Sequence, residues 1–281
     1  MECVALISLS NGLPNKQVEI ISNLEKLLTN MNIKVIKSDI IYKDISNSNY
    51  SGRDRASELM KLYKDPKIQG IFDVSGGDLA NEILQYIDFD TIKDFDKPFF
   101  GYSDLSVFIN SIYSQVQKKS YLYQIKNIVL DQTNNSFQNF YDYINNISEA
   151  FLNFNYKWLQ GSNMSGILIG GNLRCTLKLA GTKFMPDFKN KIVLIESLSG
   201  DENKIRTMLT HYKYLGVFEL CSGVLLGSFT ELENILTDSK VENLILSIID
   251  NPNIPVIKTK EIGHSYNSKA VIIGKYYKFI K

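Results

Sequence analysis

The chain has 281 residues, of which 44% are hydrophobic and 22% charged, and its formal net charge is +1. This composition is typical of a globular protein with one large or two medium domains. A charge so close to zero argues against nucleic-acid binding, which needs a concentrated basic face. The sequence shows neither a signal peptide nor an apolar stretch of about 18 residues that could span a membrane. We therefore expect a cytoplasmic protein with no nucleic-acid or membrane partner.

Three cysteines, Cys3, Cys175 and Cys221, each lie in an apolar run. Their odd number and apolar neighbours indicate small buried side chains in a reducing compartment, not a disulfide framework. The chain also has no cluster of histidine and cysteine with the spacing of metal ligands. We therefore expect no metal site.

The first half of the chain alternates apolar runs with segments of helical periodicity. Four apolar runs predict strands, at residues 3–8, 33–36, 68–74 and 98–102. Three segments with apolar residues at helical spacing predict helices, at residues 18–31, 55–63 and 80–87. This alternation predicts a parallel sheet with helices on both faces. Ligands of such sheets bind at the carboxyl ends of the strands, where Ser75-Gly76-Gly77 and Ser103 both fall.

The character of the sequence changes near residues 157–162. We place a boundary there, between an N-terminal domain at residues 1–150 and a C-terminal domain at residues 160–281. The segment before the boundary, residues 136–155, is predicted to be an amphipathic helix followed by a loop. Further strands are predicted at residues 165–170, 191–195, 222–228, 255–260 and 270–280, with a helix at residues 203–215.

The sequence Gly101-Tyr102-Ser103-Asp104 ends an apolar run abruptly, and helical periodicity follows it. A strand that turns sharply into a helix at a serine has the geometry of a nucleophile elbow, which exposes the hydroxyl and the next backbone amide. Gly101 leaves room for the turn, because a Cβ there would crowd it. Leu105 stands where the G-x-S-x-G pattern has its second glycine, so the motif is half met. The alternative is a plain connection in which Ser103 caps the helix.

A serine nucleophile needs a base, and the base needs a carboxylate to orient it. Of the two histidines, His211 lies inside an amphipathic helix and is typical of a surface residue, whereas His264 follows a glycine in a loop, where catalytic groups concentrate. A structural role is the alternative for His264. Glu196 directly follows an apolar strand, and a carboxylate there needs a partner. That partner is either a histidine Nδ1–H or, alternatively, a lysine or the next loop.

Taken together, these residues resemble the LD-carboxypeptidase family of serine peptidases, which includes the microcin C7 immunity proteins. The resemblance covers nearly the whole chain. It is carried by Gly101-Tyr102-Ser103-Asp104, Gly170-Gly171-Asn172-Leu173, Glu196 after an apolar strand, and Gly263-His264. It implies that Ser103 is the nucleophile, His264 the general base and Glu196 its orienting carboxylate.

The resemblance also implies an oxyanion hole, a fold and an assembly. The oxyanion donors would be the backbone N–H groups of Asp104 and Gly77. The fold would be α/β, with an N-terminal flavodoxin-like parallel-sheet domain, a smaller β-rich C-terminal α/β domain and the site between them. Gly76 and Asn172 would bind substrate, no cofactor would be needed, and the protein would be a homodimer. Trp158 would stack on a nucleotide base as in immunity-type members, or else be a packed inter-domain aromatic.

One turn departs from the family pattern. Cell-wall-recycling members often have Arg-Gly-Gly-Tyr-Gly where this chain has Ser75 to Leu79, so an arginine and a tyrosine expected near the substrate are missing. The resemblance implies a serine carboxypeptidase that cleaves an amide at a free C-terminus, with the L,D-bond to terminal D-Ala of muropeptides as the leading substrate. The alternatives are an immunity-type hydrolase of peptidyl or aminoacyl nucleotides and a catalytically silent binding protein.

Overall fold

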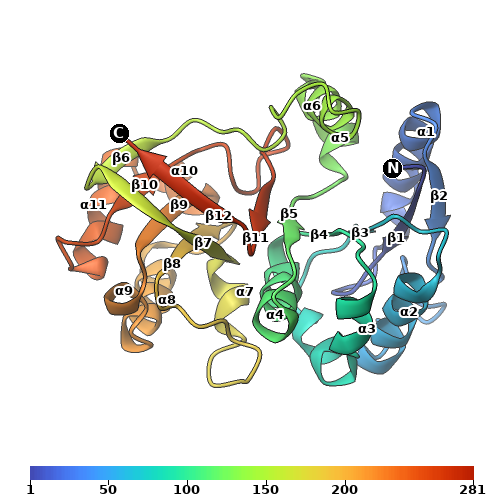
Figure 1. Ribbon diagram of the computed structural model, residues 1–281, viewed down its shortest axis with the longest axis horizontal. Coiled ribbons are helices and arrows are strands. Elements are labelled where there is room, and N and C mark those ends of the chain that lie inside the picture. Colours follow the sequence, from blue (N-terminus) through green and yellow to red (C-terminus); the bar gives the residue numbers. More distant parts are fainter.

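Two six-stranded sheets lie side by side in the computed structural model, which describes residues 1–281 (Figure 1). The strands of the first sheet, in spatial order, are β2 (Lys34–Lys37), β1 (Cys3–Ile7), β3 (Gly70–Asp73), β4 (Phe99–Gly101), β5 (Ser120–Leu122) and β11 (Val271–Ile273). The first five strands of this series are parallel, and β11 is antiparallel to β5. The order 2-1-3-4-5 is that of flavodoxin-like sheets, as predicted.

Helices cover both faces of the first sheet, because both faces of its strands are apolar. They are α1 (Val18–Asn30), α2 (Gly52–Lys64), α3 (Phe89–Asp94), α4 (Ser106–Val116), α5 (Asn127–Leu130) and α6 (Asn135–Ile144). Successive residues of a strand point to opposite faces. Accordingly, Val4 and Leu6 of β1 share a core of 19 residues with α1 and α6, whereas Ala5 and Ile7 belong to a core of 57 residues.

The second sheet is also mixed and has parallel strands at its centre. Its order is β12 (Tyr276–Ile280), β7 (Asn163–Asn172), β8 (Lys191–Ser197), β9 (Gly223–Phe229), β10 (Val256–Lys258) and β6 (Lys157–Gln160). The strands β7 to β10 are parallel, and the edge strands β12 and β6 are antiparallel to their neighbours. The helices of this half are α7 (Leu173–Leu177), α8 (Glu202–Tyr214), α9 (Val217–Leu220), α10 (Thr230–Ile235) and α11 (Asp238–Ile249). Every helix of the molecule is too short or too polar to cross a membrane.

The C-terminal part of the chain returns to the first sheet and so joins the two halves. Strand β11 pairs with β5 through Val271 opposite Leu122, and Figure 1 shows it in red beside the green strand. The 57-residue core is continuous across both halves and includes Ile71 of β3 as well as Leu194 of β8. The packing therefore unites the two sheets.

The predicted fold class is confirmed, and so are most of its strands. The four strands predicted in the first half lie within two residues of their expected bounds. Several details differ. Residues 80–86 form a 3-10 helix, and residues 157–160 form strand β6 where a boundary was expected. Strand β5 and the helices α3 and α11 were not predicted. The C-terminal segment also contributes β11 to the first sheet, which the expected division at residue 160 does not include.

Candidate active site

Ser103 stands at the turn between β4 and α4. A single 3-10 turn, Ser103–Leu105, connects the strand to the helix. The backbone of Ser103 has a φ of +55°, in the left-handed region that costs an L-residue about 1–2 kcal/mol. A Cβ on Gly101 would lie 2.8 Å from the Cβ of Leu105, so this position requires a glycine. The tight turn presents the serine hydroxyl to a pocket at the carboxyl end of the sheet.

His264 connects the serine to a buried carboxylate. Its Nε2 lies 3.0 Å from Ser103 Oγ, and its Nδ1 lies 2.7 Å from Glu196 Oε2. Glu196 is fully buried in β8 and also accepts a hydrogen bond of 3.1 Å from Asn172 Nδ2. Because the ionised carboxylate can only accept, it favours the tautomer with hydrogen on Nδ1. The Nε2 lone pair is then free to accept the serine proton.

The loop that carries His264 is fixed on both sides. Gly263 has a φ of +142°, and a Cβ there would lie 1.9 Å from Ser228 Oγ, so only glycine fits. Ser268 Oγ donates to the carbonyl of Gly263 at 2.7 Å. The ring of Tyr102 packs against the imidazole with centroids 4.5 Å apart. These contacts hold the imidazole between its two polar partners.

The side chain of Asp104 lies behind the serine and ties three segments together. Its carboxylate is fully buried and accepts from Ser10 Oγ at 2.6 Å and from the N–H of Ala80 at 2.9 Å. Its other oxygen accepts from Lys178 Nζ at 2.5 Å, at the end of α7 in the other half of the molecule. The backbone next to Ser103 is therefore fixed by an ion pair between the two halves.

The turn that contains Gly77 is also held in place by side chains of the other half of the molecule. Arg174 donates to the carbonyl of Gly77 at 3.2 Å and forms an ion pair with Asp78. Lys178 donates to the carbonyl of Asp78 at 2.8 Å, and the N–H of Asp78 donates to Asn11 Oδ1 at 3.0 Å. One cation from α7 and one from the residue directly after it thus set the position of the turn that carries the second expected oxyanion donor.

A pocket of about 620 Å³ opens above the serine, and its walls include Ser103, His264, Gly76 and Gly77. Two residues expected to bind substrate lie outside its lining. Asn172 is buried behind Glu196, and its Oδ1 accepts from the N–H of Cys175 at the start of α7. Its amide therefore positions the carboxylate.

Trp158 lies on β6, the edge strand of the second sheet, and packs against Tyr156 with ring centroids 6.3 Å apart. It does not line the pocket that contains the serine. His211 is exposed on α8 and is not among the pocket residues either.

Sequence reasoning did not identify the contacts that support the three residues. The ion pair between Asp104 and Lys178 and the bond from Asn172 to Glu196 join residues 74 and 24 positions apart. The one available signal was the position of Asp104 directly after the serine, beside an apolar helix, where a carboxylate must find a partner.

Comparisons with known proteins agree with this architecture. Residues 4–123 match the LD-carboxypeptidase N-terminal domain, and residues 165–279 match the LD-carboxypeptidase C-terminal domain. A Bacillus subtilis protein named "Probable murein peptide carboxypeptidase" is 25% identical over 232 residues, which are 79% of this chain and 72% of that protein. The microcin C7 self-immunity protein MccF of Escherichia coli is 23% identical over 254 residues, or 79% of this chain and 74% of that protein.

Solved structures share the whole fold at low sequence identity. MccF in complex with glutamyl sulfamoyl guanosine superposes with a TM-score of 0.87 at 18% identity, covering 99% of this chain and 92% of that one. Muramoyltetrapeptide carboxypeptidase from Oxalobacter formigenes superposes with a TM-score of 0.81 at 20% identity, covering 99% and 95%. Because the two domain matches span most of the sequence and follow one another in the family's order, the chain belongs to the LD-carboxypeptidase family.

Proposed function

We propose that this protein is a serine carboxypeptidase that hydrolyses the amide bond before a free C-terminus, and that its substrate bond is the L,D-bond to terminal D-Ala of a muropeptide. The observation that carries the proposal is the continuous hydrogen-bonded chain from Ser103 through His264 to Glu196 at the wall of a pocket. Family membership and the relatives named as murein peptide carboxypeptidases support the choice of substrate.

In the proposed mechanism, Ser103 Oγ attacks the scissile carbonyl while His264 Nε2 takes the hydroxyl proton. The Glu196 carboxylate stabilises the imidazolium that forms. The N–H groups of Asp104 and Gly77 hold the oxyanion, and a single such donor contributes about 3–4 kcal/mol to lowering the barrier. His264 then gives its proton to the leaving amine, and a water activated by the same histidine hydrolyses the acyl-enzyme.

An immunity-type hydrolase that cleaves peptidyl or aminoacyl nucleotides is the second candidate. The resemblance to MccF favours it, since a solved structure of that protein holds glutamyl sulfamoyl guanosine. Trp158 was expected either to stack on the base or to be a packed aromatic, and it lies on β6 and not in the pocket lining. A nucleotide bound in this pocket would therefore contact other side chains. Trp158→Ala should change kcat/KM for muropeptide and nucleotide substrates by the same factor.

The deciding experiment is a chromatographic screen of muropeptides against hydrolysable aminoacyl-adenylate analogues. We expect release of D-Ala from an L,D-tetrapeptide, and Ser103→Ala should reduce it by at least about 10³-fold. The matched control is His211→Ala, which removes an exposed imidazole on α8 and should leave kcat/KM unchanged. Cleavage of the nucleotide substrates alone would favour the second candidate. If no C-terminal amide and no nucleotide substrate is cleaved, the result favours a catalytically silent binding protein with the same fold.

The homodimer expected from the family remains a prediction. Sedimentation equilibrium of the purified chain should give twice the mass of 32.0 kDa.

A further inference from the structure

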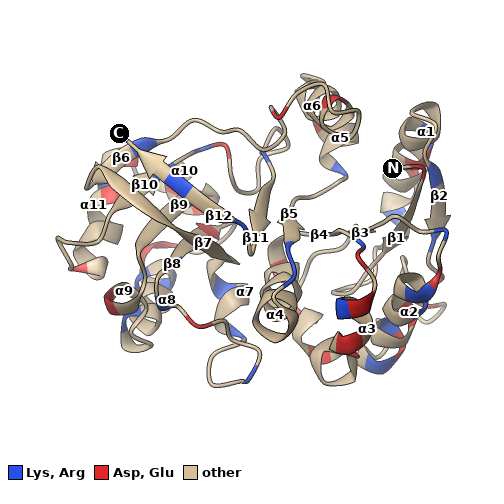
Figure 2. Cartoon of the chain, in the orientation of Figure 1, with Lys and Arg blue, Asp and Glu red and all other residues tan.

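The pocket above Ser103 is cationic, although the protein as a whole is nearly neutral. Its 19 lining residues include two lysines, Lys43 and Lys126, and no aspartate or glutamate. Over the rest of the molecule, acidic and basic residues are interspersed (Figure 2), and the formal net charge is +1. A cavity lined by one sign of charge attracts ligands of the opposite sign. The pocket therefore favours an anionic group in its ligand.

Lys126 is the better placed of the two lysines. It lies at the start of α5, just after β5, at the same edge of the sheet as Ser103. Its side chain is partly buried, and its ammonium donates to Gln17 Oε1 at 3.1 Å. This neutral amide is its only hydrogen-bond partner, and no carboxylate forms an ion pair with it. Since an ammonium has three donors, Lys126 can bind a further acceptor in the pocket.

Asp73 is the carboxylate that acts on Lys126 electrostatically, but its oxygens already accept hydrogen bonds from other residues. Asp73, at the end of β3, accepts from the N–H of Leu9 at 2.7 Å and from both the N–H and Oγ of Ser75 at 2.7 and 2.6 Å. Burial lowers the pKa of Lys126 to about 8, while the Asp73 charge opposes this shift. The positive charge of the Lys126 ammonium is therefore not fully compensated within the protein, and an anionic ligand would compensate it.

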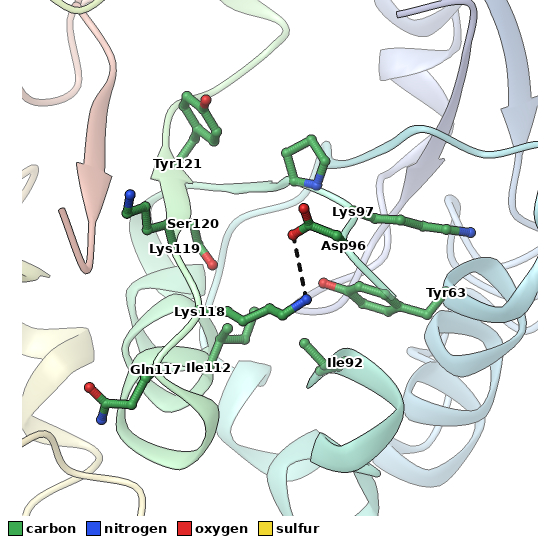
Figure 3. A pocket seen from close by; sticks show the side chains of 11 residues that line it. Tyr63, Ile92, Asp96, Lys97, Ile112, Gln117, Lys118, Lys119, Ser120 and Tyr121 are labelled. Carbon is green, nitrogen blue, oxygen red and sulfur yellow. Dashed lines mark hydrogen bonds and ion pairs between the residues drawn. The ribbon is translucent and has the colours of Figure 1, made fainter. Parts of the chain in front are cut away.

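A second cavity shows how lysines elsewhere in this fold are satisfied. It measures about 440 Å³ and lies at the amino ends of β4 and β5, at the opposite edge of the sheet (Figure 3). There Lys118 forms an ion pair with Asp96, and Lys97 donates to the carbonyls of Leu62 and Asp65. The ammonium groups of the partly buried lysines in that cavity are therefore already paired with acceptors of the protein. Lys126 differs from them because it lines the pocket of the nucleophile with donors to spare.

We propose that Lys126 binds the α-carboxylate of the substrate's C-terminal residue and thereby restricts hydrolysis to the last peptide bond. The proposal rests on the proposed carboxypeptidase function and adds the residue that determines its specificity. Such an enzyme must distinguish a terminal carboxylate from an internal amide close to the scissile bond. An incompletely paired ammonium in the same pocket as Ser103 and His264 makes that distinction by charge.

The test compares one tetrapeptide as its free acid and as its C-terminal amide. The wild-type protein should prefer the acid in kcat/KM. Lys126→Met should lower kcat/KM for the acid by about 10- to 100-fold, as expected for one charge-assisted hydrogen bond, and change the amide less than 3-fold. Lys126→Arg should restore most of the preference because it keeps the charge. Lys43→Met makes the same change of charge in the same pocket and should affect acid and amide by the same factor.

Three results would overturn the proposal. One is an equal loss on acid and amide in Lys126→Met, and another is loss of the preference in Lys43→Met. The third is an unchanged preference in Lys126→Met together with weaker inhibition by adenosine monophosphate, which would assign the lysine to a phosphate. Should Lys126→Met not fold, as judged by its melting temperature, Lys126→Gln takes its place in each comparison.

A calorimetric measurement separates this proposal from the catalytic one. Failure of the wild-type protein to hydrolyse either peptide would refute the proposed function. Binding of the acid and the amide to Ser103→Ala and to Ser103→Ala/Lys126→Met would still test the lysine. A preference for the acid that is present in the first variant and absent in the second supports the assignment. Equal affinities, or no binding to Ser103→Ala, contradict it.

Discussion

At the scale of single residues, the backbone of Ser103 gives a direct test of the elbow. Ser103→Gly and Ser103→Ala both remove the hydroxyl, and both should abolish hydrolysis. Only glycine adopts a φ of +55° without steric cost. After allowing for the greater freedom of glycine in the unfolded chain, we expect Ser103→Gly to be more stable than Ser103→Ala by about 0.5–1 kcal/mol. Urea unfolding of the two variants measures the difference, and equal stabilities would show that the turn is not strained.

The pKa of Lys126 predicts how substrate selection depends on pH. With a pKa of about 8, the ammonium is charged below that pH and becomes neutral above it. The KM of the free-acid peptide should therefore rise between about pH 7.5 and 9, while the KM of the amide stays flat. The other titratable groups around the lysine are Asp73 beneath it and Lys43, Tyr102, His264 and Tyr266 in the pocket wall. Titration of any of these in place of Lys126 would leave the rise in KM intact in Lys126→Met.

The residues proposed for catalysis could be selected as candidates from the sequence because each has a local signature. Ser103 follows an abrupt end of an apolar strand, Glu196 is a charge within an apolar strand, and His264 follows a glycine. Lys126 has no such signature. Its partner, Gln17, is 109 positions away, and a single lysine between Ile125 and Asn127 looks like any surface lysine. The availability of its ammonium is visible only when the fold is known.

At the scale of elements, the end of α7 acts as a support for the first sheet. Lys178→Met should remove the cation that pairs with the buried Asp104 and leave an uncompensated charge. Breaking a buried pair in this way typically costs about 3–5 kcal/mol. We also expect a lower kcat, because the same carboxylate holds the segment next to Ser103 in place.

Urea unfolding measures this effect, and Lys189→Met is the control because Lys189 is exposed and makes no ion pair. The control should change the free energy of unfolding by less than about 0.5 kcal/mol. Adding Asp104→Asn to Lys178→Met should recover part of the loss, since the amide oxygen can still accept from Ser10 and Ala80. No recovery would mean that Lys178 contributes through packing alone.

The prediction of elements succeeded where a strand is apolar throughout and failed where it is short or polar. Strand β5 is three residues long and follows two lysines, so no apolar run marks it. Strand β6 contains Lys157 and Gln160 and resembles a linker in sequence, because as an edge strand it is not buried on both faces. Residues 80–86 form a 3-10 helix, whose period of about 3.0 residues per turn is close to the roughly 3.6 of an α-helix, so the spacing of apolar residues does not distinguish the two over one short segment.

At the scale of the whole molecule, the two halves should unfold as one unit. They share the continuous core, the ion pair of Asp104 with Lys178, and strand β11 in the first sheet. Hydrogen exchange in increasing urea should show the amides of β3 and β8 losing protection at the same concentration. Deletion of residues 271–281 removes β11 and β12 and should replace the single unfolding transition with two. Two separate transitions in the intact chain would refute the coupling.

The long separation of Ser103 from His264 in the sequence has a consequence for synthesis. Ser103 emerges from the ribosome 161 residues before His264, its proposed base. At translation speeds of about 5–20 residues per second, this interval lasts roughly 8–30 s. During this interval the nascent polypeptide carries the proposed nucleophile without its proposed base. A chain stalled between these two positions is therefore expected to lack the proposed hydrolytic activity.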